Sequence, residues 1–322
     1  MQSSKLRIGI ISAEKSGDYL AASFIESLKS SGRDFELFGI GGKELDKFNI
    51  SRPQDFDREI LNVMGIIDPL KNLRQILRAR KQILDFLISK NINIFIGVDS
   101  PDLNSFFHKK LKKINSTINF QIVSPSVWAW RSGRVKQLRK FVDTTFCLFK
   151  FEHKYLKKHD VNSFHVGHPF QDIEKCEDVS SSKNRSGINN DSECLTFLVG
   201  SRRSEISNML SIYKKVIKKV YESDKSYSFL FPVVNQDHKN IIQAELSGLE
   251  TPIFVQTNKM KEFLSLSTFT ISTSGTASLE AACYGNIPII CYKTSLINYL
   301  ILKPLMQTNL IGLPNLILGK NV

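Results

Sequence analysis

The stretch LRIGIISAEKSGDYLAASFIESLKS, residues 6–30, decides how the beginning of the chain folds. Its first part, Leu6–Ser12, is an apolar run typical of a buried strand. A turn of small and polar residues is expected from Ala13 to Asp18, followed by a helix from Tyr19 to Ser30. The apolar stripe of that helix consists of Leu20, Phe24 and Leu28. Strand, turn and helix in this order predict the opening of a doubly wound α/β domain.

The same alternation continues along the chain and is interrupted once. Phe35–Ile40 and Ile94–Val98 are further expected strands, and Leu195–Val199 opens a second series of strands and helices. Between the two series the sequence turns polar and rich in Ser and Asn, which is typical of a linker or an exposed loop. We therefore predict two Rossmann-like domains, with residues 1–172 as the first, 173–194 as the linker or loop, and 195–322 as the second.

Composition is that of a folded protein with an unusual charge. The 322 residues are 42% hydrophobic and 23% charged, and the net charge is +13. Such a basic chain favours nucleic acid, anionic lipid or phosphorylated ligands as partners, or simply a solvated lysine-rich surface. The five cysteines form no CxxC pair, which predicts reduced thiols in a cytosolic compartment. No signal peptide and no membrane-spanning window is expected, so any membrane contact would be peripheral.

A carboxylate follows the expected strand Ile94–Val98. Asp99 begins the segment DSPDLN, and loops at the carboxyl ends of strands in open α/β sheets are where ligands bind. Asp99 is therefore a candidate general base. The same residue types also suit an ordinary helix cap, and the local sequence leaves both interpretations open.

Two segments of the second half predict anion sites. Gly200-Ser201-Arg202 follows a strand and precedes a helix, where free N–H groups, the helix dipole and a guanidinium would face a ligand. Ser274-Gly275-Thr276 stands in the same position after the strand Phe269–Ser272, with Glu280 one turn into the helix. Backbone amides for a diphosphate and a carboxylate for ribose hydroxyls fit this arrangement, and so does a capped helix without a ligand.

Asn62–Leu87 is a basic amphipathic segment. Its apolar residues recur at helical spacing, and Arg74, Arg78, Arg80 and Lys81 supply positive charge. Such a helix either lies on an anionic membrane surface or packs one face on a core and exposes the other.

The centre of the chain, Phe120–Phe170, combines aromatic and basic residues. A short strand ends at Ser124-Pro125, and both tryptophans, Trp128 and Trp130, follow within five residues. A helix with a basic face is expected next, carrying Arg131, Arg134, Lys136, Arg139 and Lys140.

The string SPSVWAWRSGRVKQLRKFVD, with FHVGHP further on, closely resembles the central signature of the lipid-A-disaccharide synthase family, bacterial glycosyltransferases of lipid A and lipopolysaccharide biosynthesis. Other segments resemble motifs of this family in the family's order: AEKSGD, VMGIIDPLKNL, GVDSPDLN, GSRRSEI, SGTASLEAA and GLPNLILGKNV. Ser12, Lys15 and Val199 depart from the pattern, and Val199 replaces a proline before the glycine turn.

The resemblance implies a GT-B fold, with two Rossmann-like domains facing a cleft. It also implies transfer of a diacylated glucosamine from UDP to a diacylated glucosamine 1-phosphate, lipid X, with inversion and a β-1,6 linkage. Asp99 matches the family's candidate base, and Arg202 would stabilise the leaving diphosphate. The implied donor-binding residues are Gly200, Ser201, Ser274, Gly275, Thr276, Glu280 and Asn315, and further candidate site residues are Glu14, Ser16, Met64, Trp128, Arg131 and His168.

No cofactor and no metal is expected. Asp55-Phe56-Asp57 has the form of a metal-binding DxD, but no apolar strand precedes it, which indicates a solvated loop. The histidines show no ligand spacing, and His168 is interpreted as an interdomain hinge or site residue. The expected location is the cytoplasmic face of the bacterial inner membrane, with an anionic lipid surface as partner, no nucleic acid, and a homodimer left open.

The family continues past the motif GLPNLILGKNV with further helices, so we expect a truncated second domain, lower stability and low or absent activity. A genuine early stop and an incomplete sequence both fit this expectation. Two rival functions remain: another GT-B enzyme of UDP-sugars such as an epimerase, and a non-catalytic, membrane-associated remnant of the family.

Overall fold

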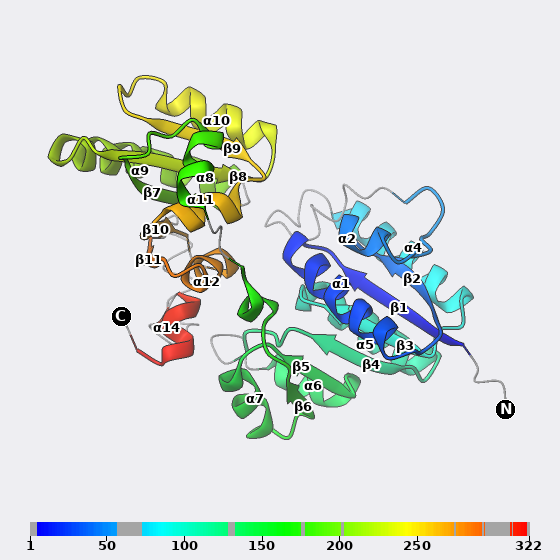
Figure 1. Ribbon diagram of the computed structural model, residues 1–322. Coiled ribbons are helices and arrows are strands. Elements are labelled where there is room, and N and C mark those ends of the chain that lie inside the picture. The colour runs from blue at the N-terminus through cyan, green and yellow to red at the C-terminus, as the bar shows by residue number, and fades with distance from the viewer. Residues whose placement is uncertain are drawn as a thin grey trace. The chain divides into compact units, whose positions relative to one another are not determined.

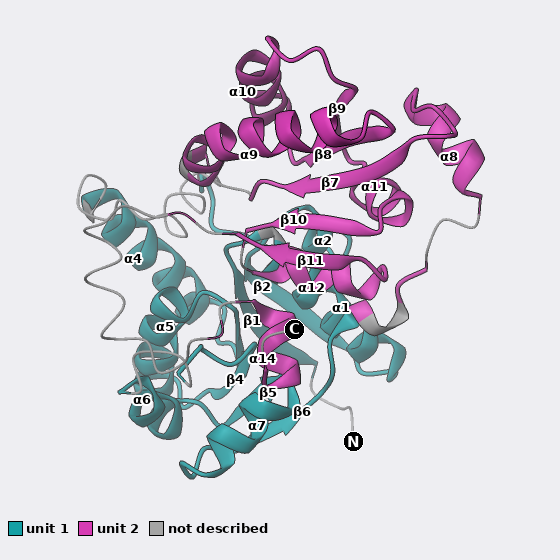
Figure 2. Cartoon of the chain, turned by 90° about the vertical axis from the view of Figure 1, so that its left-hand side faces the viewer, with its two compact units in different colours: residues 1–169 teal, residues 170–322 magenta. Residues whose placement is uncertain are grey.

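The computed structural model describes residues 5–56, 73–127, 133–174, 178–200, 203–273, 275–291, 293, 310 and 312–320. The chain divides into two compact units, residues 1–169 and 170–322 (Figure 2). Each unit is an α/β body with its own parallel sheet (Figure 1).

In the described part of unit 1, six parallel strands form a sheet in the order β2-β1-β3-β4-β5-β6. The strands are β1 (Leu6–Ser12), β2 (Phe35–Ile40), β3 (Ile94–Val98), β4 (Ile118–Ile122), β5 (Thr144–Cys147) and β6 (Ser163–His165). The helices are α1 (Lys15–Ser30), α2 (Lys43–Asp46), α4 (Leu73–Ser89), α5 (Pro101–Ile114), α6 (Arg134–Phe141) and α7 (Lys150–Lys157). The 3-10 turn η1 (Pro169–Asp172) begins at the last residue of unit 1 and continues into unit 2.

Apolar side chains fill both faces of this sheet. Ile8 and Ile10 of β1 pack with Ile25 of α1 in one cluster. Ile83 of α4 and Phe107 of α5 belong to another cluster with apolar strand residues. Strands covered on both faces read as continuous apolar runs, and this is why the sheet strands are visible in the sequence.

Helix α1 begins earlier than the sequence predicted. Residues 15–18 were expected in a turn, but α1 starts at Lys15 and includes them. The backbone N–H of Asp18 donates to the carbonyl of Glu14 at 2.9 Å, so the first helical turn is closed within the motif itself. Gly17 is tolerated there because the helix must approach the sheet closely at this point, as described below.

In the described part of unit 2, five parallel strands form a sheet in the order β11-β10-β7-β8-β9. The strands are β7 (Glu193–Leu198), β8 (Tyr227–Val233), β9 (Ile253–Thr257), β10 (Phe269–Ser272) and β11 (Ile287–Ile290). The helices are α8 (Val179–Ser186), α9 (Arg203–Ser223), α10 (Gln236–Leu246), α11 (Met260–Leu266), α12 (Thr276–Cys283) and α14 (Leu313–Leu318). Phe197, Phe229, Phe231 and Tyr213 form the centre of its core.

The polar stretch 173–194, expected as a linker or exposed loop, contains the helix α8. Asp178 caps this helix, because its carboxylate accepts the N–H of Ser181 at 2.9 Å. After the helix, Ile188 packs with Leu230 and Phe263 of unit 2. An aspartate thus caps the helix here, and Ile188 packs the end of the segment onto unit 2.

Over the described ranges, no helix is both long enough and apolar enough to cross a membrane.

Candidate functional site

The strand order places the sequence motifs of unit 1 at one edge of its sheet. β1 lies between β2 and β3, so the strand order reverses between β1 and β3. Ligands of open α/β sheets bind outside the carboxyl ends of the strands at such a reversal. The residues that follow β1 and β3 are the segment with Glu14 and Ser16 and the segment that begins with Asp99. All three side chains are half-buried.

Asp99 and Ser100 have an unusual backbone. Their φ angles are +50° and +39°, in the left-handed region that non-glycine residues seldom adopt. The N–H of Asp99 still donates to the carbonyl of Ile122 on β4 at 2.9 Å, and Ser100 is the residue before α5. Two successive residues in this conformation cost about 1–3 kcal/mol each. Strain of this kind is found where a side chain has to be presented in one direction.

The start of α1 lies directly against Asp99. A Cβ added to Gly17 would come 2.9 Å from the Ser12 hydroxyl and 3.6 Å from the Cβ of Asp99. Only glycine allows this approach. Glu14 is the N-cap residue of α1 with extended backbone, and Ser16 lies in its first turn. The structure therefore brings these two motif residues to the same edge as Asp99.

Asp18 has a structural role that sequence reasoning missed. Its buried carboxylate accepts the N–H groups of Gly42 at 2.7 Å and Glu44 at 2.8 Å. A Cβ on Gly42 would come 2.6 Å from a carboxylate oxygen of Asp18. Asp18 thus ties α1 to the beginning of α2. The signal available in the sequence was an acidic residue directly after Gly17, with Gly41-Gly42 after the next expected strand.

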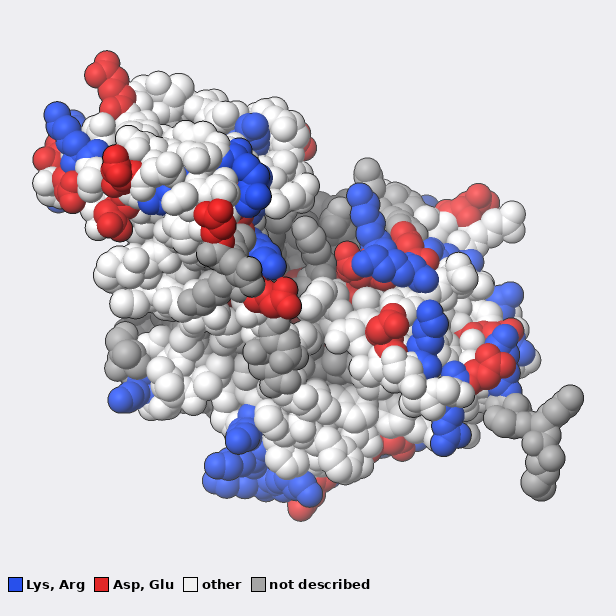
Figure 3. Space-filling view, viewed as in Figure 1, with Lys and Arg blue, Asp and Glu red and all other residues white. Residues whose placement is uncertain are grey.

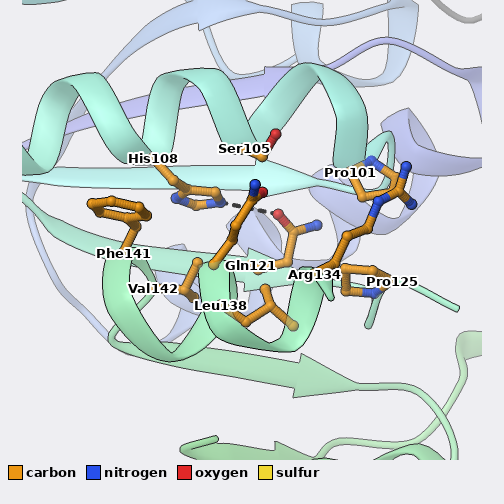
Figure 4. A pocket seen from close by; sticks show the side chains of 10 residues that line it. Pro101, Ser105, His108, Gln121, Pro125, Arg134, Leu138, Phe141 and Val142 are labelled. Atoms are coloured by element: carbon orange, nitrogen blue, oxygen red, sulfur yellow. Dashed lines mark hydrogen bonds between the residues drawn. The ribbon is translucent and has the colours of Figure 1, made fainter. Parts of the chain in front are cut away.

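A small pocket lies behind Asp99 between α5, β4 and α6 (Figure 4). His108 of α5 and Gln121 of β4 face each other in it, with their Nε2 and Oε1 atoms 3.0 Å apart. Arg134 of α6 forms an ion pair with Asp102 of α5. Burial lowers the pKa of His108 to about 4, so its imidazole is neutral at physiological pH.

His168 lies between β6 and η1, two residues before unit 2 begins. Its ring is stacked on Phe149, with centroids 5.8 Å apart and planes 16° from parallel. Burial lowers its pKa to about 4, which keeps this imidazole neutral as well.

In unit 2 the glycines of the two expected anion sites, Gly200 and Gly275, also lie at one edge. β7 and β10 are neighbours, and the strand order of this sheet reverses between them. Gly200 follows β7 with φ +91°, and Gly275 follows β10 with φ +129°. A Cβ on Gly200 would come 2.4 Å from a carboxylate oxygen of Glu205. Both turns therefore require glycine, and each leads to a helix start, at α9 and α12.

Thr276, Glu280 and Asn315 are half-buried around the start of α12. Thr276 is its first residue, and Glu280 follows one turn later. The hydroxyl of Ser278 donates to the carbonyl of Gly275 at 2.7 Å and closes the turn. Helix α14, which carries Asn315, packs against α12. The candidate donor residues Gly200, Gly275, Thr276, Glu280 and Asn315 are thus placed around two adjacent strand ends and their helices.

Six of the predicted site residues lie outside the described residues: Met64, Trp128, Arg131, Ser201, Arg202 and Ser274. Among the residues that are described, no group of three or more His, Cys, Asp and Glu side chains could hold a metal ion.

Solved structures with a similar arrangement of sheets and helices show which fold class the chain has. A UDP-GlcNAc 2-epimerase from Neisseria meningitidis, bound to UDP-GlcNAc, has a TM-score of 0.61 at 13% identity, over 98% of this chain and 90% of that chain. A glycosyltransferase from Rickettsia africae ESF-5 has a TM-score of 0.53 at 13% identity, over 89% and 79%. The chain has the GT-B fold of these α/β enzymes.

Sequence comparison identifies the family within the enzymes of this fold. The family model for lipid-A-disaccharide synthetase matches residues 8–322. The lipid-A-disaccharide synthase of Hydrogenovibrio crunogenus (strain DSM 25203 / XCL-2) is 35% identical over 314 residues, which are 97% of this chain and 83% of the relative. The chain belongs to the lipid-A-disaccharide synthetase family and is a glycosyltransferase. The resemblance drawn from SPSVWAWRSGRV and its companion motifs is thereby confirmed.

Proposed function

We propose that the chain joins UDP-2,3-diacylglucosamine to 2,3-diacylglucosamine 1-phosphate, with Asp99 as the general base. The acceptor hydroxyl loses its proton to the Asp99 carboxylate while its oxygen bonds to C1 of the donor sugar. The bond from C1 to the diphosphate breaks on the opposite side, UDP leaves, and the configuration at C1 inverts. The observation that carries this proposal is the strained pair Asp99–Ser100 at the point where the strand order of the first sheet reverses.

The donor would bind at the strand ends of unit 2. The starts of α9 and α12 suit the diphosphate, because helix N-termini attract anions. Arg202, next to the turn at Gly200, would neutralise charge on the leaving group. Glu280 lies one helical turn after Thr276, the first residue of α12, which suits hydrogen bonds to ribose hydroxyls. On this proposal residues 1–172 bind the acceptor and residues 195–322 bind the donor.

An anionic membrane surface is the proposed partner of unit 1, at the cytoplasmic face of the inner membrane. Helix α4 buries Ile76, Ile83 and Leu87 and exposes the basic residues Arg74, Arg78 and Lys81. Leu77, on the same outer face, is 52% exposed. Lysines also gather over α7 (Figure 3), where Lys150, Lys154, Lys157 and Lys158 are exposed. Basic faces with exposed apolar residues suit anionic lipid headgroups.

Turnover of the purified 322-residue chain tests the function. UDP-diacylglucosamine and the monosaccharide phosphate acceptor should give a disaccharide and UDP, even at a low rate, and unacylated UDP-GlcNAc should be a much poorer donor. Conversion of UDP-GlcNAc without an acceptor would instead support an epimerase, the activity named for the Neisseria meningitidis neighbour.

A further inference from the structure

Three polar side chains are buried directly behind Asp99. Asn104 and His108 come from α5 and Gln121 comes from β4, and their exposed fractions are 0%, 2% and 1%. Burying an amide without hydrogen bonds costs roughly 1–3 kcal/mol or more, so most buried amides have hydrogen-bond partners. The NH₂ groups of Asn104 and Gln121 donate to backbone carbonyls of the turn that presents Asp99, and the partner of His108 is Gln121.

The two amides hold that turn from both sides. Asn104 Nδ2 donates to the carbonyls of Val98 at 3.1 Å and Asp99 at 2.8 Å. Gln121 Nε2 lies 3.2 Å from the carbonyl of Asp99, 3.0 Å from that of Ile122 and 3.2 Å from that of Val123. The carbonyl of Asp99 is thus reached by both amides.

Gln121 also connects two strained turns. Val123, which follows β4, has φ +70°, a conformation that is rare for a β-branched residue. Asp99 has φ +50° in the turn that follows the neighbouring strand β3. A single amide group that donates to the carbonyls of both residues stabilises both left-handed conformations at once.

The surroundings determine how Gln121 is oriented. Three carbonyl oxygens face its Nε2, so the NH₂ group must point toward them, and its Oε1 must point toward His108 Nε2 at 3.0 Å. His108 Nε2 therefore carries a hydrogen and donates it. Because burial holds the pKa of His108 near 4, this donor stays neutral and unchanged across the physiological range. Figure 4 shows the pair enclosed between α5, β4 and α6.

Strand β3 leaves room for this arrangement at one position. A Cβ on Gly97 would come 2.8 Å from the Cβ of Asn104 and 2.9 Å from Oε1 of Gln121. The absence of a side chain at Gly97 allows both amides to reach past β3 to the turn at Asp99.

We propose that Gln121, together with Asn104 and oriented by His108, is a positioning residue that fixes the Asp99 carboxylate for deprotonation of the acceptor. This inference rests on the proposed role of Asp99. Without the amide, the turn relaxes toward right-handed backbone angles and the carboxylate moves. A misplacement of about 1 Å at a reacting group costs on the order of 100-fold in rate.

A matched control distinguishes positioning from plain fold stability. Asn119 lies two residues before Gln121 on the same strand and is 0% exposed. Its Nδ2 donates to the carbonyls of His108 at 2.9 Å and Phe141 at 2.8 Å, away from Asp99. Gln121→Met and Asn119→Leu therefore each remove one buried amide of β4, and only the first removes a bond to the Asp99 turn.

The experiment measures kcat and KM per folded molecule for both variants. Gln121→Met should lower kcat by about 10–100-fold with little change in the KM of the UDP donor, whereas Asn119→Leu should change kcat by less than about threefold. Equal losses in the two variants, or full turnover in Gln121→Met, would overturn the inference. If Gln121→Met folds poorly, His108→Phe keeps a ring against Phe95 and removes only the donor, and kcat should then fall by about 3–10-fold.

The double variant Asp99→Asn/Gln121→Met separates this inference from the proposed function. If Gln121 acts through Asp99, the second change should add less than about threefold to the loss in Asp99→Asn alone. Independent, multiplied losses would mean that Gln121 acts elsewhere. An inactive Asp99→Asn beside a fully active Gln121→Met rejects the positioning role and leaves the base intact. Near-normal turnover in Asp99→Asn rejects both.

Discussion

The turns at the carboxyl ends of the strands differ between the two units in the residue types that adopt positive φ angles. After β3 in unit 1, left-handed angles are adopted by Asp99 and Ser100, which have side chains. After β7 and β10 in unit 2, such angles are adopted by Gly200 and Gly275. Glycine adopts them at little cost, whereas a residue with a Cβ needs support from its surroundings. In unit 1 that support comes from buried amides.

The difference follows from what each edge has to offer a ligand. On the proposed mechanism the turn after β3 has to present the Asp99 carboxylate, so this position cannot be glycine and its strain has to be stabilised. On the same proposal the turns of unit 2 hold a diphosphate with N–H groups, which the backbone supplies without side chains. We therefore expect the turn after β3 to be sensitive to the chemistry of its side chain. The turns after β7 and β10 should be sensitive to an added Cβ.

The largest expected effect is on kcat and comes from changing the carboxylate of Asp99 in unit 1. Asp99→Asn is nearly isosteric but accepts no proton, so kcat should fall by roughly two to four orders of magnitude with UDP binding little changed. Steady-state kinetics and UDP titration measure this. Asp102→Asn is the control. Asp102 lies in α5, three residues after Asp99, and its exposed carboxylate forms an ion pair with Arg134. This variant should keep kcat within about threefold. Similar losses in both variants would contradict a special role for Asp99.

Acid should lower the free energy of unfolding of unit 1, because His108 is buried as a neutral imidazole. Its pKa is about 4 in the folded protein against an ordinary value of 6.5, so the unfolded chain binds more protons between these pH values. The stability contribution is present above pH 6.5 and is lost as pH falls toward 4, by up to about 3 kcal/mol. Denaturant unfolding across this range should show the loss.

His108→Phe provides the control for this pH dependence. The variant should lose part of the slope between pH 6.5 and 4, while the lowered pKa of His168 maintains a remainder. An unchanged slope in His108→Phe would show that His108 does not titrate as its burial implies.

The next prediction concerns an added Cβ at Gly275 in unit 2. Gly275→Ala places a Cβ at φ +129°, where an L-residue is strained whatever the space, so the turn before α12 should shift and UDP affinity should fall by about tenfold. Isothermal titration with UDP measures this. Gly248→Ala is the control, since a Cβ there meets nothing within 4 Å, and it should bind UDP normally. Equal affinity in both variants would remove the turn at Gly275 from the donor site.

The smallest expected effect concerns surface contact with lipid. Leu77→Ser removes an exposed apolar side chain between basic residues of α4, so binding to anionic vesicles should weaken by about fivefold, and added salt should weaken it further. Val179→Ser changes a similarly exposed apolar residue on α8 and should have no effect. Vesicle sedimentation compares the two. Indifference of the unchanged chain to anionic vesicles at low salt would contradict this partner.

Much of the fold was predictable because the signals are local. Apolar runs such as Leu6–Ser12, Ile94–Val98 and Phe269–Ser272 are strands with the expected bounds. The helix expected after the turn at Gly200 is present as α9, which runs to Ser223. The beginning of α1 was wrong by four residues, because Ser16 and Gly17 have low helix propensity and the contact with β1 and β3 stabilises them in the helix.

By itself the sequence determined the alternation of strands and helices, the family, and which carboxylate and glycines follow which strands. Only the tertiary structure decided their partners. Gln121 was visible as a polar residue in an apolar strand, but its role depends on β4 lying beside β3, so that an amide 22 positions from Asp99 reaches its carbonyl. Asp18 likewise holds backbone N–H groups 24 and 26 positions away. Parallel strands are joined by crossovers of a dozen or more residues, so a short local pattern carries no information on which chain segments meet at a sheet edge.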